Sequence, residues 1–143
     1  MSWVRIYVHM VFSTKNREPF LNSPTLRKNV FQHIKKNADE KGIWLDCVNG
    51  YSEDAHCLIS IGKEQTTSKV AQLIKGESSF WINQNKLTDQ KFIWQDDYWV
   101  SGVSNSHVER VKKYIDNQEA HHSIVTFDSE VSKLIDKGFN LSK

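Results

Sequence analysis

Residues 108–118 contain a tyrosine and a glutamine that would share one face of a helix. Tyr114 and Gln118 are four residues apart, and His121 and His122 follow within one further turn. Side chains at a spacing of four are neighbours on a helical surface. A phenol can act as a nucleophile, and amide oxygens or imidazoles beside it can hold a metal ion. The alternative is the ordinary polar face of an amphipathic helix.

A second polar pair stands about fifty residues upstream, in a segment that is typical of a strand. Asp54 and His56 are two residues apart, so they would point to one side, with Ala55 and Cys57 on the other. An oxygen and a nitrogen ligand on a rigid strand can hold one divalent cation. The alternative is an aspartate at a loop edge and a half-buried histidine. His9, within the apolar run of the first expected strand, is expected to be a hydrogen-bonded core residue.

The elements that must position these residues follow from apolar periodicity. Strands are expected at residues 3–14, 43–49 and 55–61, with a fourth strand inside the extended segment 92–103. One helix is expected to begin after the cap Ser23, with Pro24 at its first position, and to end near residue 41 before Gly42. Thr66 or Thr67 is expected to cap a second helix.

The C-terminal part is predicted to be helical. Ser106 and Glu109 have the spacing of a capping box, which predicts the start of the helix that carries Tyr114 and Gln118. These two residues flank its apolar stripe and should be partly buried. A short fourth helix is expected from Thr126 to Gly138. The element order predicts an α+β fold, a ferredoxin-like sandwich with helices on one face of an antiparallel sheet, plus the C-terminal helices.

Composition limits the class of protein without identifying its function. A chain of 143 residues suits one domain with one core, and we expect residues 1–143 to form it. The net charge of +2 permits nucleic-acid binding but does not argue for it. Cys47 and Cys57 lie in apolar runs and are expected to pack as small apolar residues. With no signal peptide at the start and no apolar run of about 18 residues, we expect a cytoplasmic protein.

Several segments, in order, resemble one family along almost the whole chain, roughly residues 3–138. They are the opening Val8-His9-Met10-Val11-Phe12-Ser13-Thr14-Lys15-Asn16-Arg17, the segment Asn49–Ser60 with Asp54-Ala55-His56, Lys75-Gly76-Glu77-Ser78-Ser79, Phe92-Ile93-Trp94-Gln95-Asp96-Asp97-Tyr98, and the expected helix Val111–Gln118 with Glu119, His121 and His122. The chain is similar to the IS-two-hundred-like TnpA transposases, the single-tyrosine HUH family, named for a His, a bulky apolar residue and a His.

This resemblance implies a reaction and a site. Tyr114 matches the family's nucleophile, which attacks a phosphodiester of single-stranded DNA and leaves a 5′-phosphotyrosine and a free 3′-hydroxyl. Asp54 and His56 match the two ligand histidines, and Gln118 matches the third ligand. The ion would be Mg²⁺ or Mn²⁺, which polarises the scissile phosphate.

The chain departs from the family pattern at two places. Asp54 replaces the first histidine, and Asp96-Asp97 stands where the family more often has a glycine before the aromatic residue. A carboxylate is a good ligand for a hard cation, but its charge also opposes a phosphate. The site therefore either binds metal through Asp54, His56 and Gln118, or belongs to a catalytically inactive or repurposed single-stranded nucleic-acid-binding protein. A ferredoxin-like domain that binds a small molecule or a protein is the third alternative.

The resemblance also implies partners. Family members recognise DNA hairpins near the ends of the element and act as homodimers in which the nucleophile helix of one subunit completes the metal site of the other. On this basis Lys15, Arg17 and Lys75 are candidate contacts to DNA phosphates, and exposed aromatic residues are candidates for stacking on unpaired bases.

Overall fold

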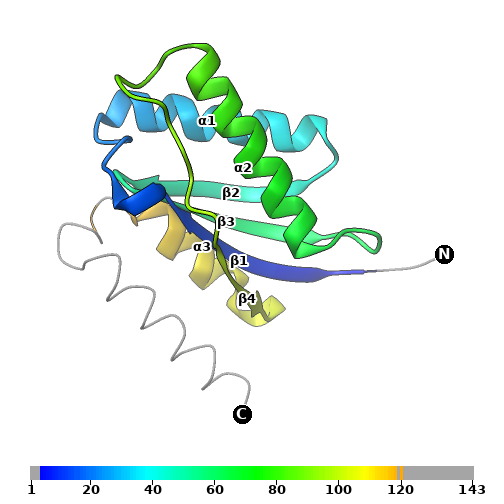
Figure 1. The fold of residues 1–143 in the computed structure, drawn as a ribbon. Helices are drawn as coiled ribbons and strands as arrows, with labels where there is room; N and C mark the ends of the chain where they lie inside the picture. Colours follow the sequence, from blue (N-terminus) through cyan, green and yellow to red (C-terminus); the bar gives the residue numbers. More distant parts are fainter. Residues whose placement is uncertain (1–3, 119, 121–143) are drawn as a thin grey trace.

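The computed structural model, which describes residues 4–118 and 120, is built on a four-stranded antiparallel sheet (Figure 1). The strands are β1 (Ile6–Ser13), β2 (Trp44–Tyr51), β3 (Asp54–Ile61) and β4 (Trp99–Val103), in the spatial order β2-β3-β1-β4. β1 therefore lies at the centre, between β3 and β4. This is the strand order of the ferredoxin-like sandwich, which confirms the predicted fold class.

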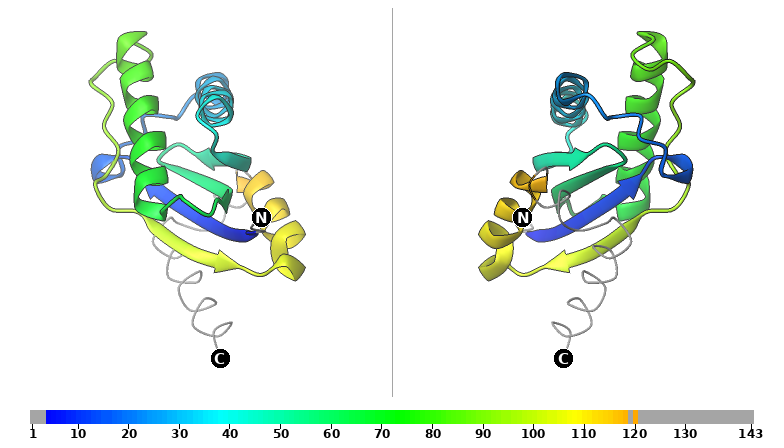
Figure 2. Two further views of the ribbon diagram at one scale, coloured as in Figure 1. Left: turned by 90° about the vertical axis from the view of Figure 1, so that its right-hand side faces the viewer. Right: turned by 90° about the vertical axis from the view of Figure 1, so that its left-hand side faces the viewer.

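Two helices cover one face of the sheet and the third lies on the other face. Helices α1 (Pro24–Glu40) and α2 (Thr67–Gln84) lie together on one side, and α3 (Val108–Asp116) lies on the opposite side (Figures 1 and 2). The two 3-10 turns are η1 (Lys15–Arg17) and η2 (Asn105–His107). Within the described residues, no helix is long and apolar enough to span a membrane.

The alternation of side chains along β1 and β3 separates an apolar face from a polar one. Toward α1 and α2, the strands contribute buried apolar side chains to the core: Val8, Met10, Phe12, Ala55, Cys57 and Ile59. Full burial of a Val, Ile, Met or Phe side chain stabilises a fold by about 1.5–3 kcal/mol. Toward α3, the same strands present His9, Asp54 and His56, all buried. The core therefore fixes the strands that orient the polar residues.

The predicted starts of the first two helices are confirmed. The Ser23 hydroxyl accepts a hydrogen bond from the Leu26 amide at 3.3 Å, and Pro24 is the first residue of α1. Thr66 caps α2 by accepting from the Lys69 amide at 3.1 Å. These bonds satisfy amide groups that the first turn of a helix leaves without partners.

The capping box predicted for the third helix is wrong. Ser106 lies inside the η2 turn, and its hydroxyl lies 3.2 Å from the Nδ1 atom of its neighbour His107. α3 begins at Val108 with His107 as its N-cap, which makes no side-chain capping bond. A local side-chain contact has taken the hydroxyl that the box would have used. The helix expected from Thr126 lies outside the described residues.

Candidate active site

The polar face of the sheet holds a buried carboxylate beside a buried imidazole, as the spacing of the two residues predicts. The Oδ2 atom of Asp54 lies 3.3 Å from the Nε2 atom of His56. Neither side chain is exposed to solvent. Because burying a charge is costly unless it is compensated, such a pair indicates a built site rather than a loop edge.

The tight turn between β2 and β3 fixes Asp54. Its Oδ1 atom accepts a hydrogen bond from the Tyr51 amide at 2.8 Å. The backbone of Gly50 passes so close that a Cβ atom there would collide with the Asp54 carbonyl oxygen. Glycine is therefore required opposite the turn, and one carboxylate oxygen is committed to the backbone while the other faces His56.

His9 is the functional neighbour that the sequence reasoning did not assign to the site. Its Nε2 atom lies 3.0 Å from the Nδ1 atom of His56. As expected, it is buried and hydrogen-bonded, but it lies on the polar face rather than in the apolar core. Burial, and after it the charge of His56, hold the pKa of His9 well below its ordinary value of 6.5. Alternation along β1 could have indicated this position, because Val8 and Met10 face the core and His9 between them must point to the opposite face of the sheet.

Helix α3 brings Tyr114 to this pair. The Tyr114 ring centroid lies 5.8 Å from that of His56 and 6.0 Å from that of His9. The phenol is half-buried. The structure thus brings together the tyrosine and the strand pair that the sequence placed sixty residues apart.

Gln118 is fully buried one turn beyond Tyr114. Its Nε2 atom donates to the Tyr114 carbonyl oxygen at 3.2 Å. Its Oε1 atom is the buried side-chain atom that has no hydrogen-bond partner in the described part of the chain. An unsatisfied buried acceptor costs about 1–3 kcal/mol, so this oxygen is poised for a donor or a cation.

Two contacts hold α3 against its own sheet. The Asn49 amide nitrogen donates to the carbonyl oxygens of Ile115 and Asp116, both at 3.1 Å. The Lys112 ammonium lies 3.4 Å from Oδ1 of Asp46, and this carboxylate raises the pKa of Lys112. Ile115 is fully buried beneath the helix. The position of Tyr114 is therefore set by contacts within one chain.

The donor set fits a divalent cation. Adjacent ligands of an octahedral Mg²⁺ ion, with bonds of about 2.0–2.1 Å, lie about 3 Å apart, close to the 3.3 Å between Asp54 Oδ2 and His56 Nε2. Among residues 4–118 and 120, no three His, Cys, Asp or Glu side chains form a metal-binding group. The amide oxygen of Gln118, a hard neutral donor that is buried without a partner among the described residues, is the candidate third ligand.

Comparison with known proteins identifies the family of the chain. Residues 2–118 match the model of a family described as IS200-like transposase. The chain belongs to the IS200-like transposase family. No match is found among curated proteins.

Two solved structures are similar in fold to this chain. One is a Deinococcus radiodurans R1 protein with a provisional assignment as a transposase: TM-score 0.66, 19% identity, covering 82% of this chain and 93% of that one. The other is a REP-associated tyrosine transposase bound to a REP hairpin: TM-score 0.54, 13% identity, covering 86% of this chain and 70% of that one. At these identities the likeness shows the fold.

Two candidate phosphate contacts of the transposase lie near the Asp54 end of the sheet. Lys15 and Arg17 are exposed in the η1 turn that follows β1. The Thr14 amide donates to the Glu53 carbonyl oxygen at 2.8 Å, which joins this turn to the residue before Asp54. Asn16 and Arg17 have φ angles of 56° and 55°. Left-handed backbone at non-glycine residues is costly and is often found at functional sites.

Lys75, the third candidate contact, has a structural role in the fold. Its ammonium donates to the carbonyl oxygens of Gln95 and Asp96, at 2.5 and 2.8 Å, and lies 5.9 Å from the Tyr98 ring centroid. Partial burial lowers its pKa. Lys75 therefore holds the segment between α2 and β4 on the face of the sheet opposite Asp54.

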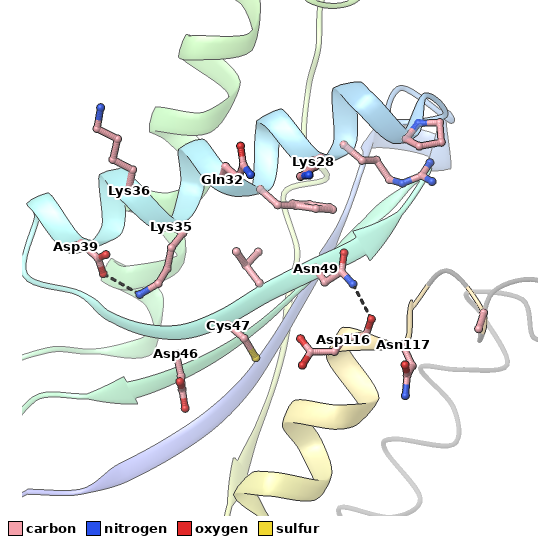
Figure 3. Close-up of a pocket in the computed structure, with 15 residues that line it drawn as sticks. Lys28, Gln32, Lys35, Lys36, Asp39, Asp46, Cys47, Asn49, Asp116 and Asn117 are labelled. Atoms are coloured by element: carbon pink, nitrogen blue, oxygen red, sulfur yellow. Dashed lines mark hydrogen bonds and ion pairs between the residues drawn. The ribbon is translucent and has the colours of Figure 1, made fainter.

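A groove of about 1020 Å³ runs along the edge strand β2 between α1 and the end of α3 (Figure 3). Lys28, Lys35 and Lys36 of α1 line it, together with Asp39 and other residues. Lys35 is paired with Asp39 at 3.0 Å. The groove reaches Asn49 and Asp116, so it ends beside the helix that carries Tyr114.

Proposed function

We propose that this IS200-like transposase cleaves and rejoins single-stranded DNA, with Tyr114 as the nucleophile. The observation that supports this best is the position of Tyr114 beside the buried Asp54–His56 pair, one turn from the unsatisfied oxygen of Gln118. A phenol, two converging ligand atoms and an orphaned amide oxygen have a joint explanation in metal-assisted phosphoryl transfer.

In the proposed reaction, the Oη atom of Tyr114 attacks the phosphorus of a phosphodiester. A new P–Oη bond forms and the bond from phosphorus to the 3′-oxygen breaks. The phenolic proton passes to water, and the departing 3′-oxygen takes up a proton from water to become a hydroxyl. The product is a 5′-phosphotyrosine, and attack by a 3′-hydroxyl reverses the step and rejoins the strand. Two displacements conserve the bond energy, so no nucleotide cofactor is needed.

Asp54, His56 and Gln118 would hold Mg²⁺ or Mn²⁺. When bound, such an ion polarises the phosphate and stabilises the charge on the leaving oxygen. The protein fixes the ligands in advance, because Tyr51 and His9 orient the strand pair. A preorganised site does not need to rearrange during the reaction.

We propose a single strand with a hairpin as the substrate. The similar REP-associated transposase is bound to a REP hairpin. Lys15 and Arg17 beside the Asp54 end, and Lys28 and Lys36 in the groove along β2, are the cations suited to its phosphates.

The family homodimer remains a proposal, and its sharing of sites is open to test. The contacts of Asn49 and of Lys112 seat α3 on its own sheet. They support a site that one chain completes before DNA binds. Sharing would require α3 to leave both contacts.

The test uses hairpin-bearing single strands with randomised flanks, preselected for binding to Tyr114→Phe protein. With Mn²⁺, a strand labelled at its 3′ end should become covalently attached to wild-type protein. The same strand labelled at its 5′ end should yield a shorter free fragment. Tyr114→Phe should bind but form no adduct, whereas the exposed-residue control Tyr98→Phe should behave as wild type. An adduct that survives Tyr114→Phe would refute the assignment.

The alternative is a single-stranded nucleic-acid-binding protein without cleavage activity. One observation favours it: both oxygens of Asp54 have partners within the chain, the Tyr51 amide and His56, so the carboxylate is satisfied without an ion. Binding without any adduct in wild type, with cleavage gained in Asp54→His, would support this alternative.

A further inference from the structure

His56 has a buried partner at each of its ring nitrogens. Its Nε2 atom faces Asp54 Oδ2 at 3.3 Å and its Nδ1 atom faces His9 Nε2 at 3.0 Å. His56 is 0% exposed and His9 is 3% exposed, so bulk water cannot replace either partner. The donor or acceptor role of His9 Nε2 must therefore be complementary to that of His56 Nδ1.

The two tautomers of His56 make opposite demands on His9. A neutral imidazole carries one proton. If Nε2 carries it and donates to the Asp54 carboxylate, Nδ1 is an acceptor and His9 Nε2 must donate. If Nε2 is to coordinate an ion, it must be unprotonated. The proton then lies on Nδ1, and His9 Nε2 must accept.

An imidazole at position 9 can meet both demands. His9 can pass its Nε2 proton along the hydrogen bond to His56 Nδ1 and take up a proton from water at its own Nδ1. At the same time His56 loses its Nε2 proton to water, so one proton enters and one leaves. Each ring keeps one proton, so the two rings stay neutral and the hydrogen bond between His9 Nε2 and His56 Nδ1 is kept in both states. A side chain that only donates or only accepts would leave one state unsatisfied.

The packing around His9 keeps its ring in place for this exchange. His9 lies on the central strand, and its ring meets Trp99 of β4 edge to face at a centroid distance of 5.3 Å. The Tyr114 ring lies 6.0 Å away at an interplanar angle of 74°. Neighbours on β3, β4 and α3 therefore restrain the His9 ring, so its protons can change position while the ring stays in place.

We infer that His9 is a positioning residue that supports the Nδ1–H tautomer of His56 when an ion binds, and so allows His56 Nε2 and Asp54 Oδ2 to exchange their mutual contact for a divalent cation. The inference rests on the metal site of the proposed function, but not on cleavage. The proposed role depends on Asp54. Without an ion, the Asp54 carboxylate accepts a hydrogen bond from His56 Nε2–H and so stabilises the opposite tautomer of His56.

The first test is the ring-nitrogen NMR spectrum of ¹⁵N-labelled protein with and without saturating Mg²⁺, which is diamagnetic. Long-range proton–nitrogen correlations distinguish protonated from unprotonated ring nitrogens, and His56→Gln and His9→Gln assign the signals. We expect His56 to carry its proton on Nε2 without Mg²⁺ and on Nδ1 with it, and His9 to change from Nε2–H to Nδ1–H. An unchanged His56 tautomer would overturn the inference.

The second test is Mg²⁺ affinity by calorimetry, with no DNA present. His9→Leu cannot accept from His56 and should bind Mg²⁺ roughly 10- to 100-fold more weakly, the usual effect of losing a partner of a ligand histidine. His9→Gln, whose amide can donate or accept, should recover most of the affinity. His33→Gln is the matched control, because His33 contacts Glu77 between α1 and α2, away from the site.

Each calorimetric outcome has a definite meaning. Equal affinity in His9→Leu and wild type would overturn the role of His9. No Mg²⁺ binding by wild type would overturn both this inference and the metal site. The covalent-adduct assay on Tyr114 is independent of these measurements and decides whether the protein cleaves DNA.

Discussion

The side-chain amide of Asn49 donates to the Ile115 carbonyl oxygen at 3.1 Å, so strand β2 caps the helix that carries Tyr114. Asn49 lies directly opposite His56 in the pairing of β2 with β3. One residue thus joins the end of the nucleophile helix to the strand pair that bears the ligands. The last carbonyl groups of a helix have no partner within it, and here the sheet supplies one.

Replacing Asn49 should loosen α3 without unfolding the sheet. Asn49→Ala removes two hydrogen bonds to the helix end, each worth about 0.5–1.5 kcal/mol. We expect faster amide hydrogen exchange in residues 108–118 and a reduced rate of adduct formation. Asn29→Ala, at an exposed position on α1, is the control. Unchanged amide exchange rates in α3 of Asn49→Ala would mean that Asn49 does not anchor the helix.

Gln118 is expected to couple the stability of the protein to divalent cations. Because its Oε1 atom is buried without a partner among the residues that the structure describes, an ion bound there should raise the melting temperature, by an amount that grows with the logarithm of the ion concentration above Kd. Mg²⁺ should therefore raise the melting temperature of wild type, and the chelator EDTA should reverse this. Gln118→Met, which removes the oxygen at similar size, should show a much smaller rise. A full response in this variant would exclude Gln118 as a ligand.

Lys75 is expected to stabilise the fold rather than to bind DNA. Its ammonium donates to two carbonyl oxygens of the segment before β4, and Lys75→Met would lose both hydrogen bonds, each worth about 0.5–1.5 kcal/mol. Urea denaturation should show this loss, while the salt dependence of DNA binding should stay the same. Lys69→Met, at an exposed position on the same helix, should change stability little. A shallower salt dependence in Lys75→Met would restore the phosphate-contact hypothesis.

His9 should make the protein less stable in mild acid. Its pKa in the folded chain is held well below the ordinary 6.5, mainly by burial. Below pH 6.5 the unfolded chain therefore takes up a proton that the folded chain does not. The free energy of unfolding decreases as the pH is lowered, until the pKa of folded His9 is reached. Above pH 6.5 this contribution is fully present. Urea denaturation between pH 5 and 8 should show this slope in wild type and a flatter one in His9→Leu.

Much of the site could be predicted because periodicity carries it. Strand parity placed Asp54 and His56 on one face. Helical spacing placed Gln118 one turn beyond Tyr114, although α3 ends at Asp116 and Gln118 follows the C-cap Asn117. The partner at His56 Nδ1 was not predicted, because pairing of β1 with β3 is a non-local property that the first strand alone does not contain. The capping box predicted at Ser106 was wrong for a local reason, since the Ser106 hydroxyl contacts the adjacent His107 instead of a helix amide.

Lys75 shows a different limit of sequence reasoning. A lysine in a segment that resembles a DNA transposase suggests a phosphate contact, yet its ammonium is committed to backbone oxygens. Charge alone does not indicate whether a partner is solvent, nucleic acid or the protein's own backbone. The two cysteines show that neighbouring strands do not ensure similar surroundings: Cys57 faces the α1–α2 core, whereas Cys47 lines the groove.

Whether active sites are shared can be decided by mixing two inactive variants. Tyr114→Phe lacks the nucleophile and His56→Ala lacks a ligand. If α3 stays on its own sheet, as the Asn49 and Lys112 contacts support, no mixed pair contains a complete site and the mixture should form no adduct. If α3 is exchanged between subunits, one site in each mixed dimer regains both groups. Up to about a quarter of wild-type sites would then react, since half the dimers are mixed and each has one complete site. Weakening the cap with Asn49→Ala in both variants should favour exchange, so adduct that appears only in that background would identify the Asn49 contact as the barrier between the two arrangements.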